Sequence, residues 1–187
     1  MPKAEEVVWP DEIPMEPQEQ ISSWHLDYTE QVLSKFLDDT TSCYVELGSW
    51  LGGSAELACR LAPNALIVCF DLWDWCGIQQ YEPEVARNSL AQFQANLWEH
   101  RHRVVMIRGD TLDGISAYCD DFTPQVIFID ADHQPERFSL DLVACRAAWP
   151  DSQICGDDLA EVERGLKCSG NRYEHISRVG WWLTEGE

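Results

Sequence analysis

Short apolar runs rich in β-branched residues recur along the chain from about Ser22 onward, and segments with a helical pattern separate them. The runs have the length of strands, and they are apolar throughout rather than alternating. Both properties are typical of strands that are buried on two faces. The runs predict five strands, at Ser42–Glu46, Leu66–Phe70, Val104–Arg108, Gln125–Ile129 and Gln153–Gly156.

The segments between the runs carry apolar residues at spacings of three and four, which predicts helices with one buried face. Ser54 is a plausible N-cap for the helix after the first strand. The final stretch, Tyr173–Thr184, predicts a β-hairpin. The predicted helices are Asp27–Leu37, Ser54–Leu61, Glu84–His100, Arg137–Trp149 and Leu159–Cys168.

Strands that alternate with helices predict an α/β fold. We expect a Rossmann-like, doubly wound and mostly parallel sheet of about seven strands, with helices on both faces and an antiparallel strand from the C-terminal hairpin. Residues 1–21 are rich in proline and acids and predict an extended N-terminal arm. Residues 22–187 then form a single domain.

The charge balance is strongly acidic, with 33 Asp and Glu against 13 Lys and Arg, and a formal net charge of −20. So few cations cannot form the large cationic face by which proteins bind nucleic acids. An anionic membrane surface would repel the chain for the same reason. The 45% of hydrophobic residues, with nine tryptophans, excludes a disordered acidic tail. We therefore expect an acidic globular protein that binds neither nucleic acid nor membranes.

The eight cysteines form no C-x-x-C pair, and several lie inside apolar runs, among them Cys43, Cys69 and Cys155. Such residues behave as small buried hydrophobic groups, which is typical of reduced thiols. The N-terminal segment has no apolar core of a secretory signal, and no apolar run approaches the roughly 20 residues of a membrane span. These observations predict a cytoplasmic protein.

Ligands of doubly wound sheets bind beyond the carboxyl ends of the strands. The first strand is followed by the glycine segment, Gly48–Ser54, with Glu46 two residues before it. Gly48 permits a tight turn, and the helix start attracts a carboxylate or phosphate. Trp50 stands where a G-x-G-x-x-G fingerprint needs glycine, and no G-K-[ST] follows, which disfavours dinucleotides and a P-loop. An acid before the glycines suits a ligand with an ammonium beside its carboxylate, although a turn without a ligand is the alternative.

The second and third strands also end in polar residues. Asp71 lies about 20 residues beyond the first glycine, where a carboxylate often binds the hydroxyls of a ribose. An Asp at a strand end is, however, often only a cap. Asp110 and Thr111 follow the third strand. They suit contacts with an adenine ring, and Asp110 equally suits the N-cap of a helix.

Asp130, Asp132 and His133 follow the fourth strand, and Asp157 and Asp158 follow the fifth. Adjacent carboxylates repel each other at a buried strand end unless a cation lies between them. Oxygen ligands from two strand ends suit Mg²⁺, which keeps water or substrate oxygens in its other positions. N-capping of the following helix is the alternative for the last two acids.

The segments VELGSWLGGSA, FIDADH and GDD together resemble the class I S-adenosylmethionine-dependent methyltransferases. More narrowly, they resemble the metal-dependent O-methyltransferases around catechol O-methyltransferase and the macrocin and aminocoumarin sugar O-methyltransferases. The resemblance runs from about Ser22 to Asp158. It implies S-adenosylmethionine and Mg²⁺ as cofactors. It implies the metal ligands Asp130, Asp157 and Asp158, and cofactor contacts from Glu46, Gly48, Ser49, Trp50, Ser54, Asp71, Asp110, Thr111 and Asp130.

The resemblance leaves the catalytic base open between two residues. The position of the base lysine in the catechol branch holds His133, and that of the base aspartate in the sugar branch holds Asp132. The implied acceptor is the hydroxyl of a small molecule, either a sugar or a phenol, and a homodimer is common in this fold. Two alternatives remain: metal-independent N-methylation, and a non-catalytic or regulatory protein that binds the cofactor. The aromatic loop Trp73–Tyr81 either stacks on a ring of a ligand or packs internally.

Overall fold

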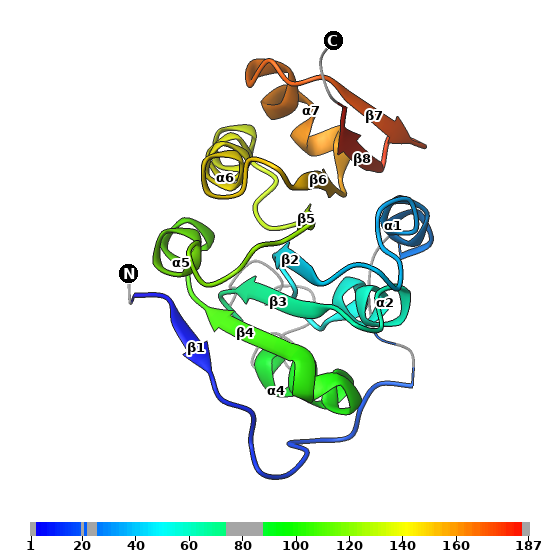
Figure 1. Cartoon of the computed structure of the whole chain (residues 1–187), viewed down its shortest axis with the longest axis vertical. Helices are drawn as coiled ribbons and strands as arrows, with labels where there is room; N and C mark the ends of the chain where they lie inside the picture. Colours follow the sequence, from blue (N-terminus) through cyan, green and yellow to red (C-terminus); the bar gives the residue numbers. More distant parts are fainter. Residues whose placement is uncertain (1–2, 20, 22–25, 74–87, 185–187) are drawn as a thin grey trace.

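A computed structural model describes residues 3–19, 21, 26–73 and 88–184. Within these residues, eight strands form one sheet in the order β1-β4-β3-β2-β5-β6-β8-β7 (Figure 1). The five central strands are parallel, and β1, β7 and β8 are antiparallel to their neighbours. The strands are β1 (Glu5–Val7), β2 (Cys43–Leu47), β3 (Leu66–Asp71), β4 (Val104–Arg108), β5 (Val126–Ile129), β6 (Gln153–Gly156), β7 (Tyr173–Ile176) and β8 (Gly180–Leu183).

Helices cover both faces of the sheet (Figure 1). Helices α1, α2 and α4 pack on one apolar core, which includes Tyr44 and Phe93. Helices α5, α6 and α7 pack on a second core, which includes Phe138 and Trp181. The helices are α1 (Leu26–Leu33), α2 (Gly53–Leu61), α4 (Ser89–Asn96), α5 (Thr111–Tyr118), α6 (Pro135–Ala148), α7 (Leu159–Cys168) and the 3₁₀ helix η2 (Trp98–Arg103).

The predicted α/β class is confirmed, and each of the five predicted strands agrees with the structure to within one residue. The predicted helix Glu84–His100 is too long: α4 begins at Ser89 and ends at Asn96, and residues 84–87 lie outside the described ranges. The prediction of Ser54 as an N-cap is wrong. Helix α2 begins at Gly53 after Gly52, whose φ of +90° is a left-handed conformation that glycine adopts at little cost.

The first part of the N-terminal arm is an edge strand, which adds one strand to the roughly seven expected and gives eight within the described residues. Strand β1 pairs antiparallel with β4, with Glu5 opposite Arg108. Next to it, the indole of Trp9 donates a hydrogen bond of 2.9 Å to the carbonyl of Val104 and packs at 6.1 Å against Trp98. These contacts attach the arm to the sheet, and its separation from a domain of residues 22–187 stays a prediction.

The predicted C-terminal hairpin is confirmed as β7 and β8, with β8 antiparallel to β6. Trp181 of β8 is fully buried, packs edge-on against Phe138 of α6 at 5.4 Å and donates a hydrogen bond of 2.8 Å to the carbonyl of Asp157. The hairpin therefore supports the backbone at the end of β6, where two of the predicted site residues lie.

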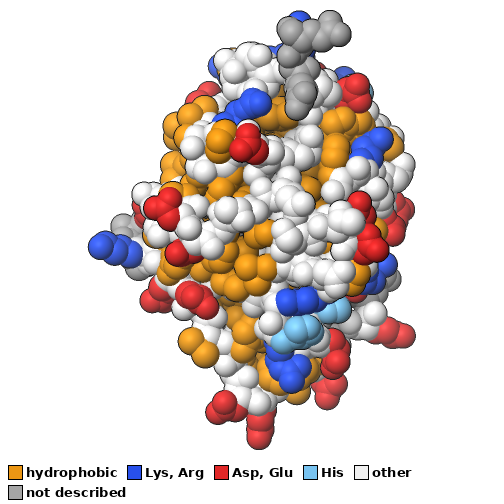
Figure 2. All heavy atoms as spheres, in the orientation of Figure 1, with side chains coloured by type: hydrophobic (Ala, Val, Ile, Leu, Met, Phe, Trp, Pro, Cys, Tyr) orange, Lys and Arg blue, Asp and Glu red, His pale blue; other side chains and the backbone are white. Residues whose placement is uncertain are grey.

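Acidic side chains are dispersed over the face of the molecule that Figure 2 shows, with hydrophobic groups between them. In the part of the chain that the structure describes, the cysteines are free thiols, and most are buried. Burial raises the pKa of the Cys43 thiol to about 11, so this thiol is neutral at ordinary pH.

None of the helices within the described ranges has the length and apolar character that a membrane span requires.

Candidate active site

The carboxyl ends of the central strands meet beside the glycine segment. Strand β2 lies between β3 and β5, so the strand order reverses there. The N–H of Gly48 donates to the carbonyl of Phe70 at 2.8 Å, and the N–H of Asp130 donates to the carbonyl of Leu47 at 2.8 Å. Gly48 has a φ of +84°, and a Cβ at this position would overlap the backbone of Asp130. Glycine is therefore required for the close contact between the glycine segment and Asp130.

Glu46 is a fully buried acid in the middle of the sheet. The hydroxyl of Tyr44 donates to its Oε2 at 2.7 Å, whereas Oε1 has no hydrogen-bond partner within the described residues. Burial raises the pKa of the Glu46 carboxyl to about 7, and the Tyr44 hydroxyl acts in the opposite direction. The hydroxyl of Ser49 is also buried without a partner in the same set of residues. Unpaired buried oxygens are costly, so both atoms are available to a polar ligand.

Asp71 holds the glycine segment in place. Its Oδ2 accepts hydrogen bonds of 2.7 Å from the N–H groups of Ser49 and Trp50, and its Oδ1 accepts one of 2.7 Å from Trp73. Asp71 therefore has a structural role at this turn, and its contact with a ribose stays a prediction. The indole of Trp73 is buried against Phe93 and donates to the carbonyl of Trp50. The remainder of the predicted aromatic loop, residues 74–81, lies outside the described residues.

Asp110 is the N-cap of α5, because its Oδ1 accepts a hydrogen bond of 3.0 Å from the N–H of Leu112. The same oxygen lies 2.7 Å from Nη2 of Arg137. The hydroxyl of Thr111 donates to Oδ1 of Asp141 at 2.6 Å. The predicted adenine-side residues are thus tied to α6, and their contact with adenine stays a prediction.

Arg137 and Asp141 belong to this network, although no sequence motif indicated either residue. Asp141 is fully buried, and burial raises the pKa of its carboxyl. A signal was present, because Asp141 falls on the same face of the predicted helix as Phe138, Leu142 and Cys145. An acid on an apolar face needs a partner, but the sequence did not show that this partner comes from α5.

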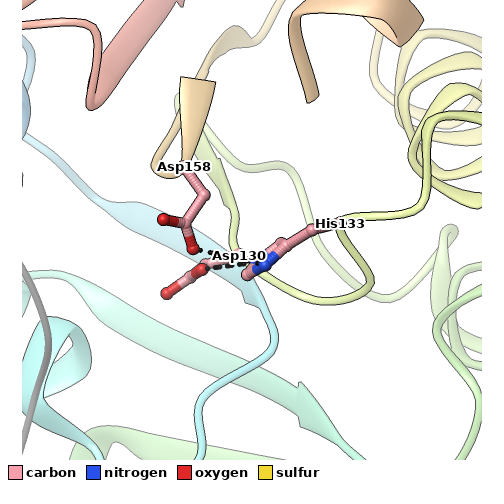
Figure 3. Close-up of side chains that lie close together, drawn as sticks. All are labelled: Asp130, His133 and Asp158. Atoms are coloured by element: carbon pink, nitrogen blue, oxygen red, sulfur yellow. Dashed lines mark hydrogen bonds and ion pairs between the residues drawn. The ribbon is translucent and has the colours of Figure 1, made fainter. Parts of the chain in front are cut away.

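Asp130, His133 and Asp158 form a compact group at the ends of β5 and β6 (Figure 3). Nε2 of His133 lies 3.2 Å from Oδ1 of Asp130, and its Nδ1 lies 3.3 Å from Oδ2 of Asp158. Each residue offers one ligand atom, and these atoms all lie within 4.8 Å of one another. The group therefore combines two carboxylates and an imidazole in the space that one metal ion would need.

The electrostatics of this group favour a positive charge at its centre. The hydrogen bond to Asp130 raises the pKa of His133, although burial acts against it. Burial raises the pKa of the Asp130 carboxyl, and His133 lowers it. Asp158 has a φ of +51°, which is uncommon for a residue other than glycine. It stands at the N-cap position of α7, yet its side chain makes no capping hydrogen bond there.

Two of the predicted site acids point elsewhere. Oδ1 of Asp157 accepts a hydrogen bond of 2.7 Å from the N–H of Asp158, and Oδ2 accepts one of 3.3 Å from the hydroxyl of Thr29. Oδ1 of Asp132 accepts a hydrogen bond of 2.8 Å from the N–H of Gln134, just before α6. The structure therefore brings together Asp130, Asp158 and His133, whereas Asp157 and Asp132 lie outside this group of ligand atoms.

A family model described as "Methyltransferase domain" matches residues 45–159, which is more than half of the chain. The match includes every predicted site residue from Glu46 to Asp158. No curated protein matches the chain.

Solved structures share the fold at low identity. The chain is 16% identical to CalS11, a TDP-rhamnose 3'-O-methyltransferase of calicheamicin biosynthesis, with a TM-score of 0.57 over 85% of this chain and 78% of CalS11. It is 15% identical to a putative caffeoyl-CoA O-methyltransferase from Staphylococcus aureus, with a TM-score of 0.57 over 89% and 85% of the two chains.

A third structure is MycE of the mycinamycin pathway, in complex with Mg and SAH. Its identity is 13%, and its TM-score is 0.55 over 82% of this chain and 47% of MycE. At these identities the likeness shows a common fold, and the match of the family model identifies the family. The chain belongs to the methyltransferase-domain family and is an S-adenosylmethionine-dependent methyltransferase.

Proposed function

We propose that the protein transfers a methyl group from S-adenosylmethionine to a hydroxyl of a small molecule, a sugar or a phenol, with the help of a divalent cation. The observation that carries this proposal is the group of Asp130, His133 and Asp158 at two neighbouring strand ends. Two converging carboxylates are suitable ligands for Mg²⁺ or Mn²⁺. Cation-assisted methyl transfer is best suited to an oxygen acceptor, because a hydroxyl is a weak nucleophile until it loses its proton.

The glycine segment fits the methionine end of the cofactor. Oε1 of Glu46 and the hydroxyl of Ser49 are buried polar atoms that lack a protein partner within the described residues. A ligand with an ammonium group would supply the missing partner for a carboxylate. The start of α2, with Ser54 buried in its first turn, offers N–H groups to the ligand's carboxylate. Asp71 would then contact the ribose, and Asp110 and Thr111 would lie beside the adenine.

The metal-binding part of the proposal rests on Asp130 and Asp158. Their carboxylates approach the same imidazole, and the strained backbone of Asp158 directs its side chain there instead of capping α7. Backbone strain of this kind often occurs at functional sites. Asp157 as a third ligand stays a prediction, because its oxygens accept hydrogen bonds from Thr29 and from the backbone of Asp158.

When bound, S-adenosylmethionine supplies an electrophilic methyl group, and a divalent cation lowers the pKa of the acceptor hydroxyl. His133 would accept the proton of that hydroxyl if the cation took over its contact with one of the two carboxylates, because both of its ring nitrogens lie within hydrogen-bonding distance of a carboxylate in the metal-free structure. Asp130 and Asp158 orient the ring and stabilise its protonated form. Asp132 is the alternative base, but its Oδ1 is engaged by the backbone N–H of Gln134.

The acceptor class is supported by the relatives of the fold. CalS11 is described as a TDP-rhamnose methyltransferase, and the Staphylococcus aureus protein as a putative caffeoyl-CoA O-methyltransferase. MycE was solved with Mg and SAH. These names cover a sugar and a phenolic acceptor, which are the two classes that the sequence suggests.

One observation favours a metal-independent enzyme as the second candidate. His133 lies within hydrogen-bonding distance of both carboxylates and, when protonated, compensates their charge without any ion. A protein with this internal cation would transfer the methyl group to a nucleophile that needs no activation, such as an amine.

Chelation of divalent cations distinguishes the two candidates. We expect EDTA to lower the rate of methyl transfer at least about tenfold, and added Mg²⁺ or Mn²⁺ to restore it, because the acceptor hydroxyl depends on the cation for its acidity. Calorimetric titration of the protein with MnCl₂ should show binding. An unchanged rate in EDTA, together with no heat of binding, would favour the metal-independent enzyme.

A further inference from the structure

The side chain of Asn96, the last residue of α4, connects the N-terminal arm to the glycine segment. Its Nδ2 donates to the carbonyl of Leu51 at 2.9 Å and to Oε1 of Gln18 at 3.2 Å. Its Oδ1 accepts from the N–H of Gln18 and from Nε2 of Gln92, each at 2.9 Å. A side-chain amide has two donors and two acceptor positions, and Asn96 uses all four.

The carbonyl of Leu51 lies at a demanding point of the glycine segment. Trp50 before it and Gly52 after it both have a positive φ, of +41° and +90°. Leu51 itself is fully buried. A backbone carbonyl in such a place needs a hydrogen-bond partner, and the amide of Asn96 supplies one. The conformation of the glycine segment therefore depends in part on the orientation of Asn96.

The arm holds Asn96 from the other side. The backbone and the side chain of Gln18 each bond to it, and the carbonyl of Glu16 accepts a further bond of 3.2 Å from Gln92. Gln18 and Asn96 also line, together with Gly53, an open pocket of ≈ 340 Å³. The arm thus lies against α4, and the pocket separates it from the start of α2.

The beginning of the arm approaches the adenine side of the proposed site. Beyond β1, Ala4 lies against Gly109, where a Cβ would come within 2.8 Å of the Cα of Ala4. Gly109 immediately precedes Asp110. Figure 1 shows the arm (blue) running from β1 around the α4 end of the molecule. The arm therefore contacts the loop at Gly109 directly and reaches the glycine segment through Asn96.

We propose that Asn96 is a positioning residue for the cofactor, through which the N-terminal arm fixes the glycine segment. This inference rests on the proposed binding of S-adenosylmethionine at that segment. It gives the arm a role in cofactor affinity, while the acceptor and the chemical step depend on other residues. Loss of the Asn96 contacts should loosen the segment and weaken cofactor binding.

Asn96→Asp tests this role with almost no change in shape. The substitution replaces the two N–H donors with an oxygen that faces the carbonyl of Leu51 and Oε1 of Gln18. We expect the Kd for S-adenosylhomocysteine, measured by calorimetry, to rise about tenfold. The KM for S-adenosylmethionine should rise in parallel, and kcat at saturation should stay within roughly twofold, because only binding is affected.

Asn64→Asp is the matched control. The amide of Asn64 also donates to a backbone carbonyl, that of Asp39, at 2.8 Å. It lies between α2 and β3, at the amino end of the strands and away from the proposed site. Asn64→Asp also replaces an amide donor with a carboxylate and adds one negative charge. Its Kd for S-adenosylhomocysteine should stay at the value of the unsubstituted protein.

Asn96→Ala and Gln18→Ala cover the case in which Asn96→Asp does not fold. Both should raise the Kd, Gln18→Ala by the smaller factor, and hydrogen exchange should become faster at residues 49–53 in Asn96→Ala. An unchanged Kd in the folded Asn96 variants would overturn the inference. Absence of S-adenosylhomocysteine binding by the unsubstituted protein would instead overturn the proposed function.

Discussion

Replacing Asp158 with Asn should lower kcat/KM for methyl transfer by roughly 10²–10³-fold, the scale of a lost Lewis-acid contribution of several kcal/mol. Asn has the shape of Asp but no charge, so it would bind a divalent cation poorly. The side chain of Asp158 makes no capping hydrogen bond to α7. The free energy of unfolding should therefore change by less than about 1 kcal/mol. Asp130→Asn should cause a loss of similar size, because both carboxylates approach the same point.

Two further substitutions serve as a charge control and as a test of the third predicted metal ligand. Asp151→Asn changes the net charge equally at an exposed position before β6, and its rate should remain that of the unsubstituted protein. Asp157→Asn tests the third predicted ligand. A loss equal to that of Asp158→Asn would assign Asp157 to the metal, and a small loss would assign it to support of the Asp158 backbone. A rate for Asp158→Asn close to that of the unsubstituted protein would contradict the proposed metal site.

Glu46→Gln should stabilise the ligand-free protein at pH 8 by about 3 kcal/mol, because the buried carboxyl is costly to ionise. Its pKa is about 7 in the folded protein and 4.5 in an ordinary environment. A raised pKa means that the folded state holds its proton longer than the unfolded state. The contribution of the protonated Glu46 side chain to the free energy of unfolding is thus fully present below pH 4.5. It falls as pH rises and is lost once pH exceeds about 7.

Urea unfolding between pH 5.5 and 8.5 checks this prediction. The advantage of Glu46→Gln over the unsubstituted protein should grow with pH by about 2 kcal/mol across that range. Glu56→Gln, at an exposed pair with Arg60, should show no such growth. A Glu46→Gln protein that is less stable than the unsubstituted one at pH 8 would contradict the raised pKa of the buried carboxyl.

The same substitution should weaken cofactor binding. An ionised Glu46 attracts the ammonium or sulfonium of S-adenosylmethionine, whereas Gln does not. The affinity of the unsubstituted protein for S-adenosylmethionine should therefore rise as pH increases through 7, and that rise should be absent in Glu46→Gln. Glu46 therefore destabilises the ligand-free protein and strengthens cofactor binding, a trade-off that is common for functional residues.

The sequence predicted the central strands well because they are buried on both faces and carry continuous apolar runs. It missed β1, since three residues with Glu5 and Glu6 among them give no apolar run. It offered α5 only through the alternative of Asp110 as an N-cap and gave the helix no bounds, because the helix is short and contains Gly114. Its predicted helix Glu84–His100 was wrong at the C-terminal end, because the apolar spacing continues into η2 although the α-helix stops at Asn96.

The candidate site was predictable where it depends on strand ends, and not where it depends on side-chain direction. Adjacent acids such as Asp157 and Asp158 look equivalent in a sequence. The left-handed backbone at Asp158 turns one toward His133 and leaves the other bonded to Thr29. Likewise, the choice between Asp132 and His133 depends on how the chain enters α6. Contacts between distant segments, such as Gln18 with Asn96, leave no local pattern at all.

The measurement that tests the central claim most directly is the fate of a labelled methyl group. The protein would be incubated with methyl-labelled S-adenosylmethionine and a panel of phenols, nucleotide-linked sugars and amines, with the products identified by mass spectrometry and NMR. We predict label on an oxygen of a phenol or sugar, and loss of that product in EDTA. Label on nitrogen, or binding of the cofactor without transfer to any acceptor, would contradict O-methylation.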